Sequence, residues 1–342
     1  MTNILLLCAA TPSQQLNPLI KVSTTPATME LSKVHLVSVF TASDSPETGG
    51  NLLPVVLDAS ALSEEDMRRI AREYGHEASF LIPLPEASSE SQKADYQLRF
   101  FVPEHEMEMC GHATVGTTWL LGELGIIRDD QKEVCYSTKS GLVRARRRQQ
   151  EGRILIEVSQ PRGWVTPVQD EALRREIAAV LGESAGDKIN TESIQNACTS
   201  RAKTVVPMRD SAALDALKPD FSRMQALCEK LGSTGLYPYA PHNDNSSNVP
   251  TRNDSLVVHA RQFPKASGYP EDAATGIAAA ALSFALLENN VLGEDRSVVV
   301  RQGEAMGCPS EIRVRIEFDG EEAVCWIGGT VRHVKRFETN EN

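Results

Sequence analysis

The chain has 342 residues, which fits two domains of ordinary size or one large one. Its formal net charge of −11 argues against nucleic acid or an anionic membrane as the main partner, because both recruit patches of Lys and Arg. The seven cysteines are widely spaced without a C-x-x-C pair, which favours a cytoplasmic protein over a disulfide framework or a zinc knuckle, and no apolar run reaches the ~18 residues that span a bilayer.

Residues 1–32 carry Thr, Ser and Pro without clear periodicity, and we interpret them as an N-terminal extension. From Lys33 the pattern changes: residues 34–40 alternate like a strand, and 63–66 resemble a capping box in front of a helix. Further strands are expected near 80–83, 96–102, 134–138, 142–147 and 154–158, with a helix over about 112–122. A first lobe over 33–150 accounts for these elements.

Residues 151–335 repeat this order of elements, and we assign them to a second lobe. Helical patterns lie near 171–181 and 221–231, and an alanine-rich apolar helix spans about 275–287. Strand patterns lie near 204–206, 255–263, 297–301, 311–318 and 323–334. The last of these strands is a candidate to cross to the first lobe, and 336–342 form a tail.

Two apolar helices, one starting near 111–116 and one near 273–278, are rich in small residues on all faces, which predicts that both are buried. They lie about half the chain apart, and strands surround each of them. This repetition favours two similar lobes that arose by duplication, with the cleft between them as the expected site.

One basic cluster, Arg144, Arg146, Arg147 and Arg148, lies in a stretch that looks like a strand. We interpret it as a solvated sheet face or a turn.

The start of each apolar helix is a candidate binding site. In 106–114, Gly111 lets backbone approach a ligand closely, and the first amides of the helix are free donors that favour an anion such as a substrate carboxylate. The alternative is that small residues only let a buried helix pack tightly. In 268–276, Glu271 and Asp272 come just before the second helix, where acidic residues are also ordinary stabilisers of the helix dipole.

Glu77 stands where a helix ends and an apolar strand begins. A carboxylate held against apolar surface has a raised pKa, which suits proton transfer near neutral pH. A lone glutamate at the start of a strand is more often simply solvated.

Taken together, these segments resemble the phenazine-biosynthesis-F-like (PhzF-like) family. The ordered matches cover about 33–335 and comprise 34–41, 50–51, 70–73, 76–80, 99–103, 106, 110–114, 261–264, 271–276, 302–310 and 327–331.

The resemblance implies an α+β diaminopimelate-epimerase-like fold, with two pseudo-symmetric lobes that each roll a β-sheet around a central helix. It implies a cofactor-independent isomerase that moves a proton between carbons of a small carboxylate-bearing metabolite, in which the motif glutamate falls on Glu77 and His112 and Asp272 position the substrate or assist the proton. The substrate-binding residues implied are Gly111, Thr114, Thr275, Gly276, Ile277 and Asn51. Family members are often homodimers, so a homodimer is expected by resemblance.

The chain departs from the family pattern in ways that bear on the substrate. Leu52 replaces a frequent proline, and Ile277 replaces a serine whose hydroxyl would contact the ligand, which suggests a more apolar substrate of secondary metabolism. Related epimerases and racemases use two cysteines, one at each helix start. Cys110 falls on the first position, but we expect Ala273 at the second, which cannot take a proton and therefore argues against a two-thiol reaction.

No histidine or cysteine spacing typical of a metal site occurs, and no G-x-G-x-x-G loop follows a strand, so neither a metal nor a redox cofactor is predicted. Cys110 is interpreted as a small buried residue. Two alternatives stay open: a lyase or other proton-transfer enzyme with the same base, and a non-catalytic ligand-binding or scaffold protein on the same fold.

Overall fold

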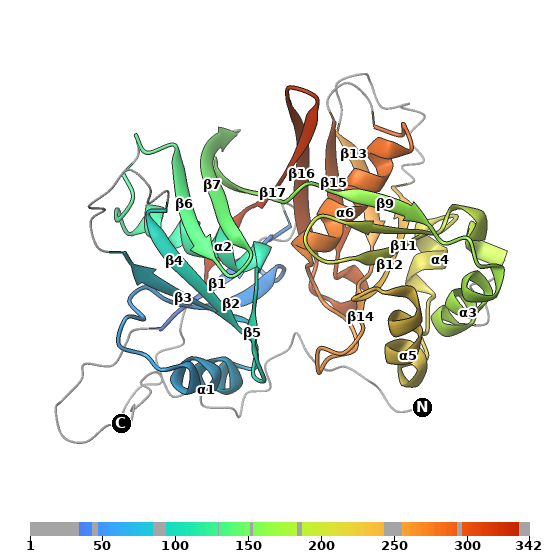
Figure 1. Cartoon of the computed structure of the whole chain (residues 1–342), viewed down its shortest axis with the longest axis horizontal. Coiled ribbons are helices and arrows are strands. Elements are labelled where there is room, and N and C mark those ends of the chain that lie inside the picture. Colours follow the sequence, from blue (N-terminus) through green and yellow to red (C-terminus); the bar gives the residue numbers. More distant parts are fainter. Residues whose placement is uncertain are drawn as a thin grey trace.

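The computed structural model describes residues 34–42, 47–84, 94–128, 130–150, 153–182, 187–242, 255–292 and 296–334. The predicted extension (1–32) and tail (336–342) lie outside the described residues. Two lobes stand side by side, and each has a curved sheet wrapped around one central helix (Figure 1). Among the described residues no helix is long and apolar enough to cross a membrane.

The first lobe holds one buried helix, α2 (Gly111–Glu123), and one outer helix, α1 (Glu64–Tyr74). Its strands are β1 (Val34–Val39), β2 (Asn51–Val56), β3 (Ala78–Pro83), β4 (Tyr96–Phe101), β5 (Glu106–Met107), β6 (Glu133–Thr138), β7 (Gly141–Gln150) and β8 (Arg153–Ser159). Because β8 pairs with β7, the first lobe extends past the boundary predicted at residue 150. The predicted capping box is present, because Ser63 and Asp66 exchange backbone and side-chain hydrogen bonds at the start of α1.

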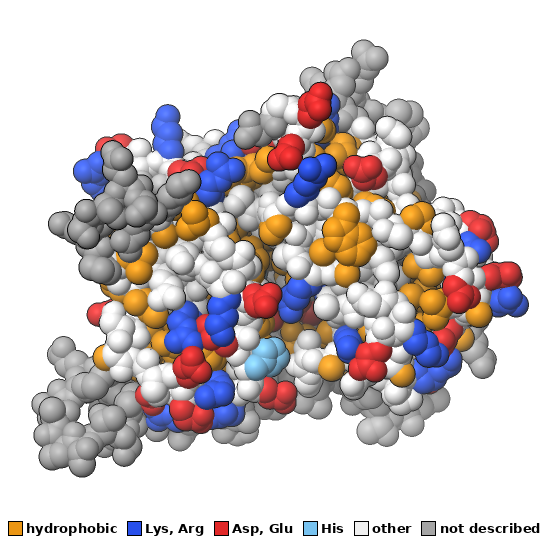
Figure 2. All heavy atoms as spheres, viewed as in Figure 1, with side chains coloured by type: hydrophobic (Ala, Val, Ile, Leu, Met, Phe, Trp, Pro, Cys, Tyr) orange, Lys and Arg blue, Asp and Glu red, His pale blue; other side chains and the backbone are white. Residues whose placement is uncertain are grey.

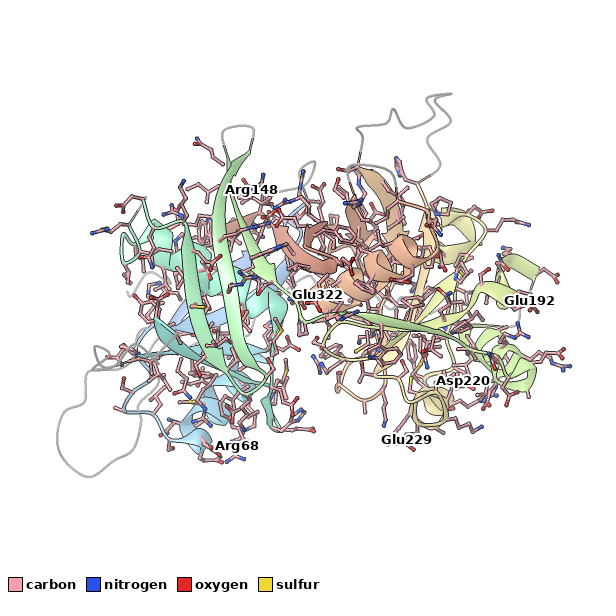
Figure 3. All side chains as sticks on the ribbon, turned by 45° about the horizontal axis from the view of Figure 1, so that its top comes forward. Arg68, Arg148, Glu192, Asp220, Glu229 and Glu322 are labelled. Carbon is pink, nitrogen blue, oxygen red and sulfur yellow. The ribbon has the colours of Figure 1, made fainter. Side chains whose placement is uncertain are left out.

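The second lobe holds the buried helix α6 (Gly276–Glu288) and the outer helices α3 (Glu171–Leu181), α4 (Ser211–Asp215) and α5 (Phe221–Leu231). Its strands are β9 (Trp164–Pro167), β10 (Gln195–Cys198), β11 (Lys203–Pro207), β12 (Gly235–Pro241), β13 (Leu256–Ala260), β14 (Phe263–Pro264), β15 (Ser297–Gln302), β16 (Ser310–Asp319) and β17 (Glu322–Gly329). Short 3-10 turns lie at Thr191–Ser193 and Glu304–Met306. Asp220 and Glu229, at the two ends of α5, lie at the periphery of this lobe (Figure 3).

The two lobes share one order of strand pairing. In the first, β1 pairs antiparallel with β2, β2 parallel with β3, β3 antiparallel with β4, and β4 parallel with β6. In the second, β10, β11, β12, β13 and β15 repeat these four pairings in the same sequence and sense. Helices α2 and α6 form the connections that a parallel pair requires, β4 to β6 and β13 to β15. The pattern is that of a duplicated unit.

The composition of α2 and α6 explains their central position. Most of their residues are small or aliphatic, and both helices are buried on nearly all sides. They belong to one hydrophobic core that runs through both lobes. Helices α3 and α5 cover the outside of the second lobe over a smaller core of their own.

The last strands connect the two lobes. β17 pairs with β16 of the second lobe and with β8 of the first. After Thr330 the chain continues as β18 (Val331–His333), which pairs with β1. The second lobe's hairpin β16–β17 therefore lies at the boundary between the lobes (Figure 1), and β18 joins the first sheet beside β1.

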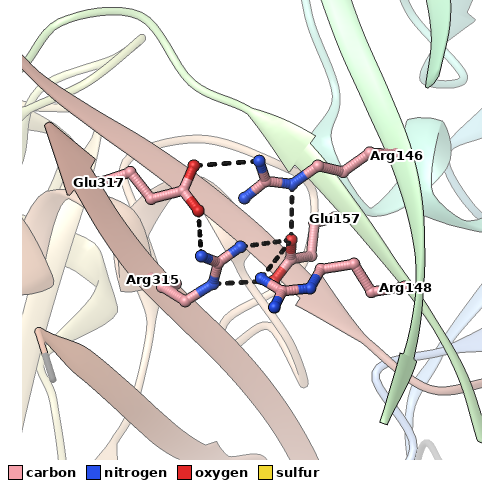
Figure 4. Close-up of polar contacts among 5 residues, drawn as sticks. All are labelled: Arg146, Arg148, Glu157, Arg315 and Glu317. Carbon is pink, nitrogen blue, oxygen red and sulfur yellow. Dashed lines mark hydrogen bonds and ion pairs between the residues drawn. The ribbon is translucent and has the colours of Figure 1, made fainter. Parts of the chain in front are cut away.

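The interpretation of the basic cluster as a solvated face is wrong for Arg146. Its Nε donates to Glu157 of β8 at 2.7 Å and its Nη1 to Glu317 of β16 at 3.0 Å, and its guanidinium lies 3.6 Å from the ring centroid of Trp326 (Figure 4). Arg315 of β16 also donates to Glu157, at 2.8 Å. Because Glu157 is buried, a cation on each side satisfies its charge, and the cluster links the lobes.

On the rest of the surface, Lys and Arg are intermixed with Asp and Glu over the face that Figure 2 shows. Arg144 and Arg148 at the ends of the cluster are exposed, as expected.

The structure corrects several predicted elements. The strand predicted over 255–263 is two strands, because Arg261 and Gln262 interrupt it. Both parts pair with β12, and the first part also pairs with β15. The strand predicted over 34–40 ends at Val39, since Phe40 has a positive φ of 64°. Strands β2, β9, β10 and β12 and helix α4 were not predicted.

Candidate functional site

A cavity of about 470 Å³ lies between the lobes, where the starts of α2 and α6 meet. The first lobe contributes His76, Glu77, Glu104, Cys110, Gly111 and His112 to its wall, and the second lobe contributes Arg201, Lys203, Gln262, Tyr269, Asp272, Thr275, Gly276 and Ile277. The cavity therefore brings together catalytic and substrate-binding candidates from distant parts of the sequence.

The two helix starts are built alike. Each begins at a glycine, Gly111 or Gly276, and a Cβ at these positions would lie 2.4 Å or 2.8 Å from the same Ile327 Cδ1 of β17. No side chain caps either helix and neither first turn contains an acidic residue. The positive ends of both helix dipoles therefore point toward the cavity without a built-in counter-charge, an arrangement that favours an anion.

The N-caps also correct the sequence alignment of the two starts. Cys110 is the N-cap of α2, and Thr275 is the N-cap of α6. The position equivalent to Cys110 is therefore Thr275 and not Ala273. Thr275 has no thiol either, so the argument against a two-thiol reaction still holds, now on the basis of Thr275.

Glu77 is positioned by the end of α1. Gly75 ends that helix in the left-handed conformation, with φ of 68°, and Glu77 follows just before β3. Its Oε2 accepts a hydrogen bond from the Cys110 thiol at 3.2 Å and lies 3.3 Å from Nδ1 of His112. The side chain is 21 % exposed, so the carboxylate is open toward the cavity.

Cys110 is more than the small packing residue that we predicted. Its Sγ also lies 3.2 Å from His112 Nδ1, so thiol, imidazole and carboxylate form a compact triangle. Burial and the charge of Glu77 raise the pKa of Cys110 well above its ordinary value. A protonated thiol is a hydrogen-bond donor, which is how it meets Glu77.

These three residues are also the group whose side-chain atoms lie close enough to hold a metal ion, all within 4.8 Å of one another. The thiol proton already satisfies Glu77, and metal binding would require losing that proton. The second imidazole nitrogen of His112, Nε2, is buried and has no hydrogen-bond partner among the described residues. It is available to a bound ligand.

Asp272 lies in a hydrogen-bonded network at the start of α6. Its Oδ1 accepts from Asn51 Nδ2 at 3.1 Å, its Oδ2 from the Thr275 hydroxyl at 2.5 Å, and its backbone carbonyl from Gln302 Nε2 at 2.7 Å. Burial, and then the charge of Glu77, raise the pKa of Asp272 to about 6. The neighbouring Glu271 is bound to Arg261 in a two-bonded ion pair instead.

The predicted substrate-binding residues fall into two groups. Gly111, Thr275, Gly276 and Ile277 line the cavity. Asn51 acts through Asp272 and also donates to the Ala274 carbonyl at 3.1 Å. Thr114 is fully buried, does not line the cavity, and donates its hydroxyl to the Cys110 carbonyl at 2.9 Å.

Sequence reasoning missed the basic wall of the cavity, which contains Arg201 and Lys203. The one available signal is Lys203 itself, a lysine that begins a short strand with the sequence KTVVP. Burial within an apolar strand is unusual for lysine unless a partner or a ligand compensates the charge.

Comparisons with known proteins show the family and the fold of the chain. The model of the phenazine biosynthesis-like protein family matches residues 37–335. An uncharacterised isomerase, YddE of Escherichia coli K12, is 31% identical over 87% of this chain and 95% of its own length. The trans-2,3-dihydro-3-hydroxyanthranilate isomerase of Pseudomonas aeruginosa is 29% identical over 84% of this chain and 92% of its own. A PhzF-family crystal structure from Bacillus anthracis superposes with a TM-score of 0.73 at 25% identity, over 88% of this chain and 96% of its own.

Proposed function

We propose that this chain, which belongs to the phenazine biosynthesis-like (PhzF-like) family and is an isomerase, moves a proton between two carbons of a small carboxylate-bearing substrate, with Glu77 as both base and acid. The observation that supports this role most directly is the position of the Glu77 carboxylate. It lines the cavity beside both helix starts, and its Oε2 contacts the Cys110 thiol and the His112 imidazole.

The substrate carboxylate would bind at the starts of α2 and α6, where two helix dipoles favour an anion. That placement brings a neighbouring carbon next to Glu77. Glu77 removes the proton of an activated C–H bond, and the electron pair moves into the adjacent unsaturated system. The protonated Glu77 then returns a proton to another carbon on the same face, so that substrate and product have the same composition. Because the carboxyl proton can exchange with solvent before it is returned, turnover in D2O can place deuterium in the product.

His112 and Asp272 stabilise the charge that develops during this transfer. His112 can donate through Nε2, which has no partner among the described residues. Asp272, whose pKa is raised to about 6, holds a proton more readily than an ordinary aspartate and can bind a polar group of the substrate.

The name of the Pseudomonas relative supplies the first compound to test, trans-2,3-dihydro-3-hydroxyanthranilate. Ile277 presents an aliphatic side chain to the cavity, and we expect the carbon frame of the true substrate to be more apolar at this point. The homodimer that resemblance suggests stays a prediction, which size-exclusion chromatography with light scattering tests.

The deciding experiment measures proton exchange in D2O by mass spectrometry. Wild type, Glu77→Gln and a control, Glu104→Gln, are incubated with trans-2,3-dihydro-3-hydroxyanthranilate and then with a cell extract of small metabolites. Glu104 is a matched control because it lines the same cavity but is exposed. Loss of a positioned acid/base lowers the rate ~10²–10⁴-fold, so Glu77→Gln should lose turnover and deuterium incorporation while Glu104→Gln keeps both.

A product of the same elemental composition as the substrate identifies an isomerisation, and an added mass unit from deuterium shows that the proton on Glu77 exchanges with solvent before it is returned. Loss of a small fragment would instead identify an elimination that uses the same base. Near-normal turnover by Glu77→Gln would sink the assignment of Glu77.

A further inference from the structure

The proposed proton transfer leaves two cations of the cavity unused. Lys203 begins β11, and Arg201 lies in the turn between β10 and β11. Both line the cavity on the side of the second lobe. Their charges act on the proposed catalytic groups, because Lys203 interacts electrostatically with Arg201, Asp272 and Glu77.

Lys203 is a buried cation without a protein partner. Its residue is 5 % exposed, and no hydrogen bond or ion pair joins its ammonium group, or the guanidinium of Arg201, to the described part of the chain. An unpaired buried charge costs several kcal/mol, which in practice lowers its pKa. Burial first, and Arg201 second, lower the pKa of Lys203 to about 7.

Other lysines of the chain have the carboxylate partner that Lys203 lacks. Lys265 lines the same cavity and lies 3.3 Å from Glu229. Lys139 pairs with Glu106, and Lys230 pairs with Glu176. The most buried of these four lysines is thus the one that lacks a carboxylate.

Gln262 provides a second, independent observation. It is 1 % exposed and lines the cavity, yet neither its Oε1 nor its Nε2 has a hydrogen-bond partner among the described residues. Buried amides are nearly always satisfied, so this one lacks a ligand or water. Its amide nitrogen is a donor, the type of group that an anion needs.

We propose that Lys203, Arg201 and Gln262 form a subsite for a second acidic group, and that the substrate is therefore a small dicarboxylate. The first carboxylate occupies the helix starts, and this assignment rests on the proposed function. The second carboxylate of the substrate binds Lys203. It supplies the missing partner and restores the charged form of the ammonium group. Ile277 then contacts the carbon frame between the two acidic groups.

The test uses inert probes and needs no turnover. Isothermal titration calorimetry measures malonate, succinate, glutarate and adipate against monocarboxylates of the same chain length, on wild type, Lys203→Met and Lys265→Met. Charge-assisted hydrogen bonds lead us to expect at least one dicarboxylate to bind about tenfold tighter than its monocarboxylate. This preference should disappear in Lys203→Met and persist in Lys265→Met, which removes a lysine of the same cavity that already has a partner.

Proton uptake gives a second readout. Near pH 8, dicarboxylate binding to wild type should take up protons as Lys203 becomes charged, which appears as a dependence of the binding enthalpy on the buffer. Lys203→Met should show none. If this variant does not fold, Arg201→Gln, at an exposed position, should reduce the preference about threefold or more.

Equal affinity for mono- and dicarboxylates in wild type, or an unchanged preference in Lys203→Met, would overturn the subsite. The same titrations on Glu77→Gln separate this result from the proposed function. The preference should survive there, since Glu77 is not part of the subsite, even if the role of Glu77 in proton transfer proves wrong.

Discussion

The starts of α2 and α6 have the same backbone design and different side chains. Each begins at a glycine packed on Ile327, and each points an uncapped first turn at the cavity. Around the start of α2 stand a carboxylate, a thiol and an imidazole that touch one another. Around the start of α6, the carboxylate of Asp272 is instead fixed by neutral donors, Asn51 and Thr275.

This difference shows how two lobes with the same backbone design can take different roles in one reaction. Both halves keep an uncapped helix start, a backbone feature that favours an anion. The side chains are specialised, so that the first lobe carries the proposed proton shuttle and the second carries a fixed carboxylate and two cations. The predictions below break or sharpen this division.

After Glu77→Gln, Asp272→Asn should have the largest effect. It removes the charge of the fixed carboxylate while nearly preserving its shape, and we expect kcat/KM to fall about 10²-fold, the size typical of losing one preorganised electrostatic group. Glu271→Gln is the control, because that neighbour pairs with Arg261 outside the network. Equal losses in both variants would contradict a special role for Asp272.

The same variant should be more stable than wild type at neutral pH. A folded-state pKa raised from 3.8 to about 6 means that the native protein holds this proton more tightly than the unfolded chain. The associated stability is present below pH 3.8 and is lost as the pH rises through 6. Asp272→Asn avoids that loss, at most about 3 kcal/mol, and its advantage in urea unfolding should grow between pH 4 and pH 7. An advantage that is constant with pH would contradict the raised pKa.

Asn51→Ala should have the next largest effect. Asn51 reaches from the first lobe to Asp272 and to the Ala274 carbonyl, so its loss frees the carboxylate to rotate. We expect about a tenfold loss of kcat/KM in the wild-type background and little further loss in Asp272→Asn. Independent, multiplicative losses in the double variant would show that Asn51 acts on something else.

Cys110 should give the smallest effect. Cys110→Ala removes the donor to Glu77 and should lower kcat by about threefold to tenfold, whereas Cys110→Ser keeps a donor and should stay close to wild type. Cys135→Ala, a free cysteine on β6, serves as the control. Loss of nearly all activity in Cys110→Ser would contradict this role. It would mean that the thiol transfers a proton itself, as in a two-thiol racemase.

Much of the fold was predictable because periodicity and caps are local signals. The helix at Phe221–Leu231 was predicted to the residue, and α2 and α6 were predicted within one residue at each end. The missed strands lack such signals. β12 contains Pro238 and Pro241, and β9 is four residues long and largely exposed, so their strand structure depends on neighbours distant in the sequence.

The site was predictable where it lies in a recognisable motif. Glu77, His112 and Asp272 were identified through the family resemblance, and all three line the cavity. The network of Asn51 and the cations of the β10–β11 turn were not predicted, because only folding brings them next to Asp272. Thr114 belongs to the motif and was predicted to bind substrate, but its hydroxyl donates to the Cys110 carbonyl at the start of α2 and does not line the cavity.

The crossing of β17 and β18 has a consequence for how the protein is made. Most of the first lobe leaves the ribosome first, yet the strands that close its sheet, the end of β17 and β18, are synthesised only after the strands and helices of the second lobe. The first sheet therefore stays incomplete until the second lobe has been synthesised. The pairing of β1 with β18 joins residues nearly 300 positions apart. Such long-range pairing slows folding and exposes unpaired strand edges. A chain that stops just before Val331 would therefore keep β17 but leave β1 of the first lobe without its partner β18.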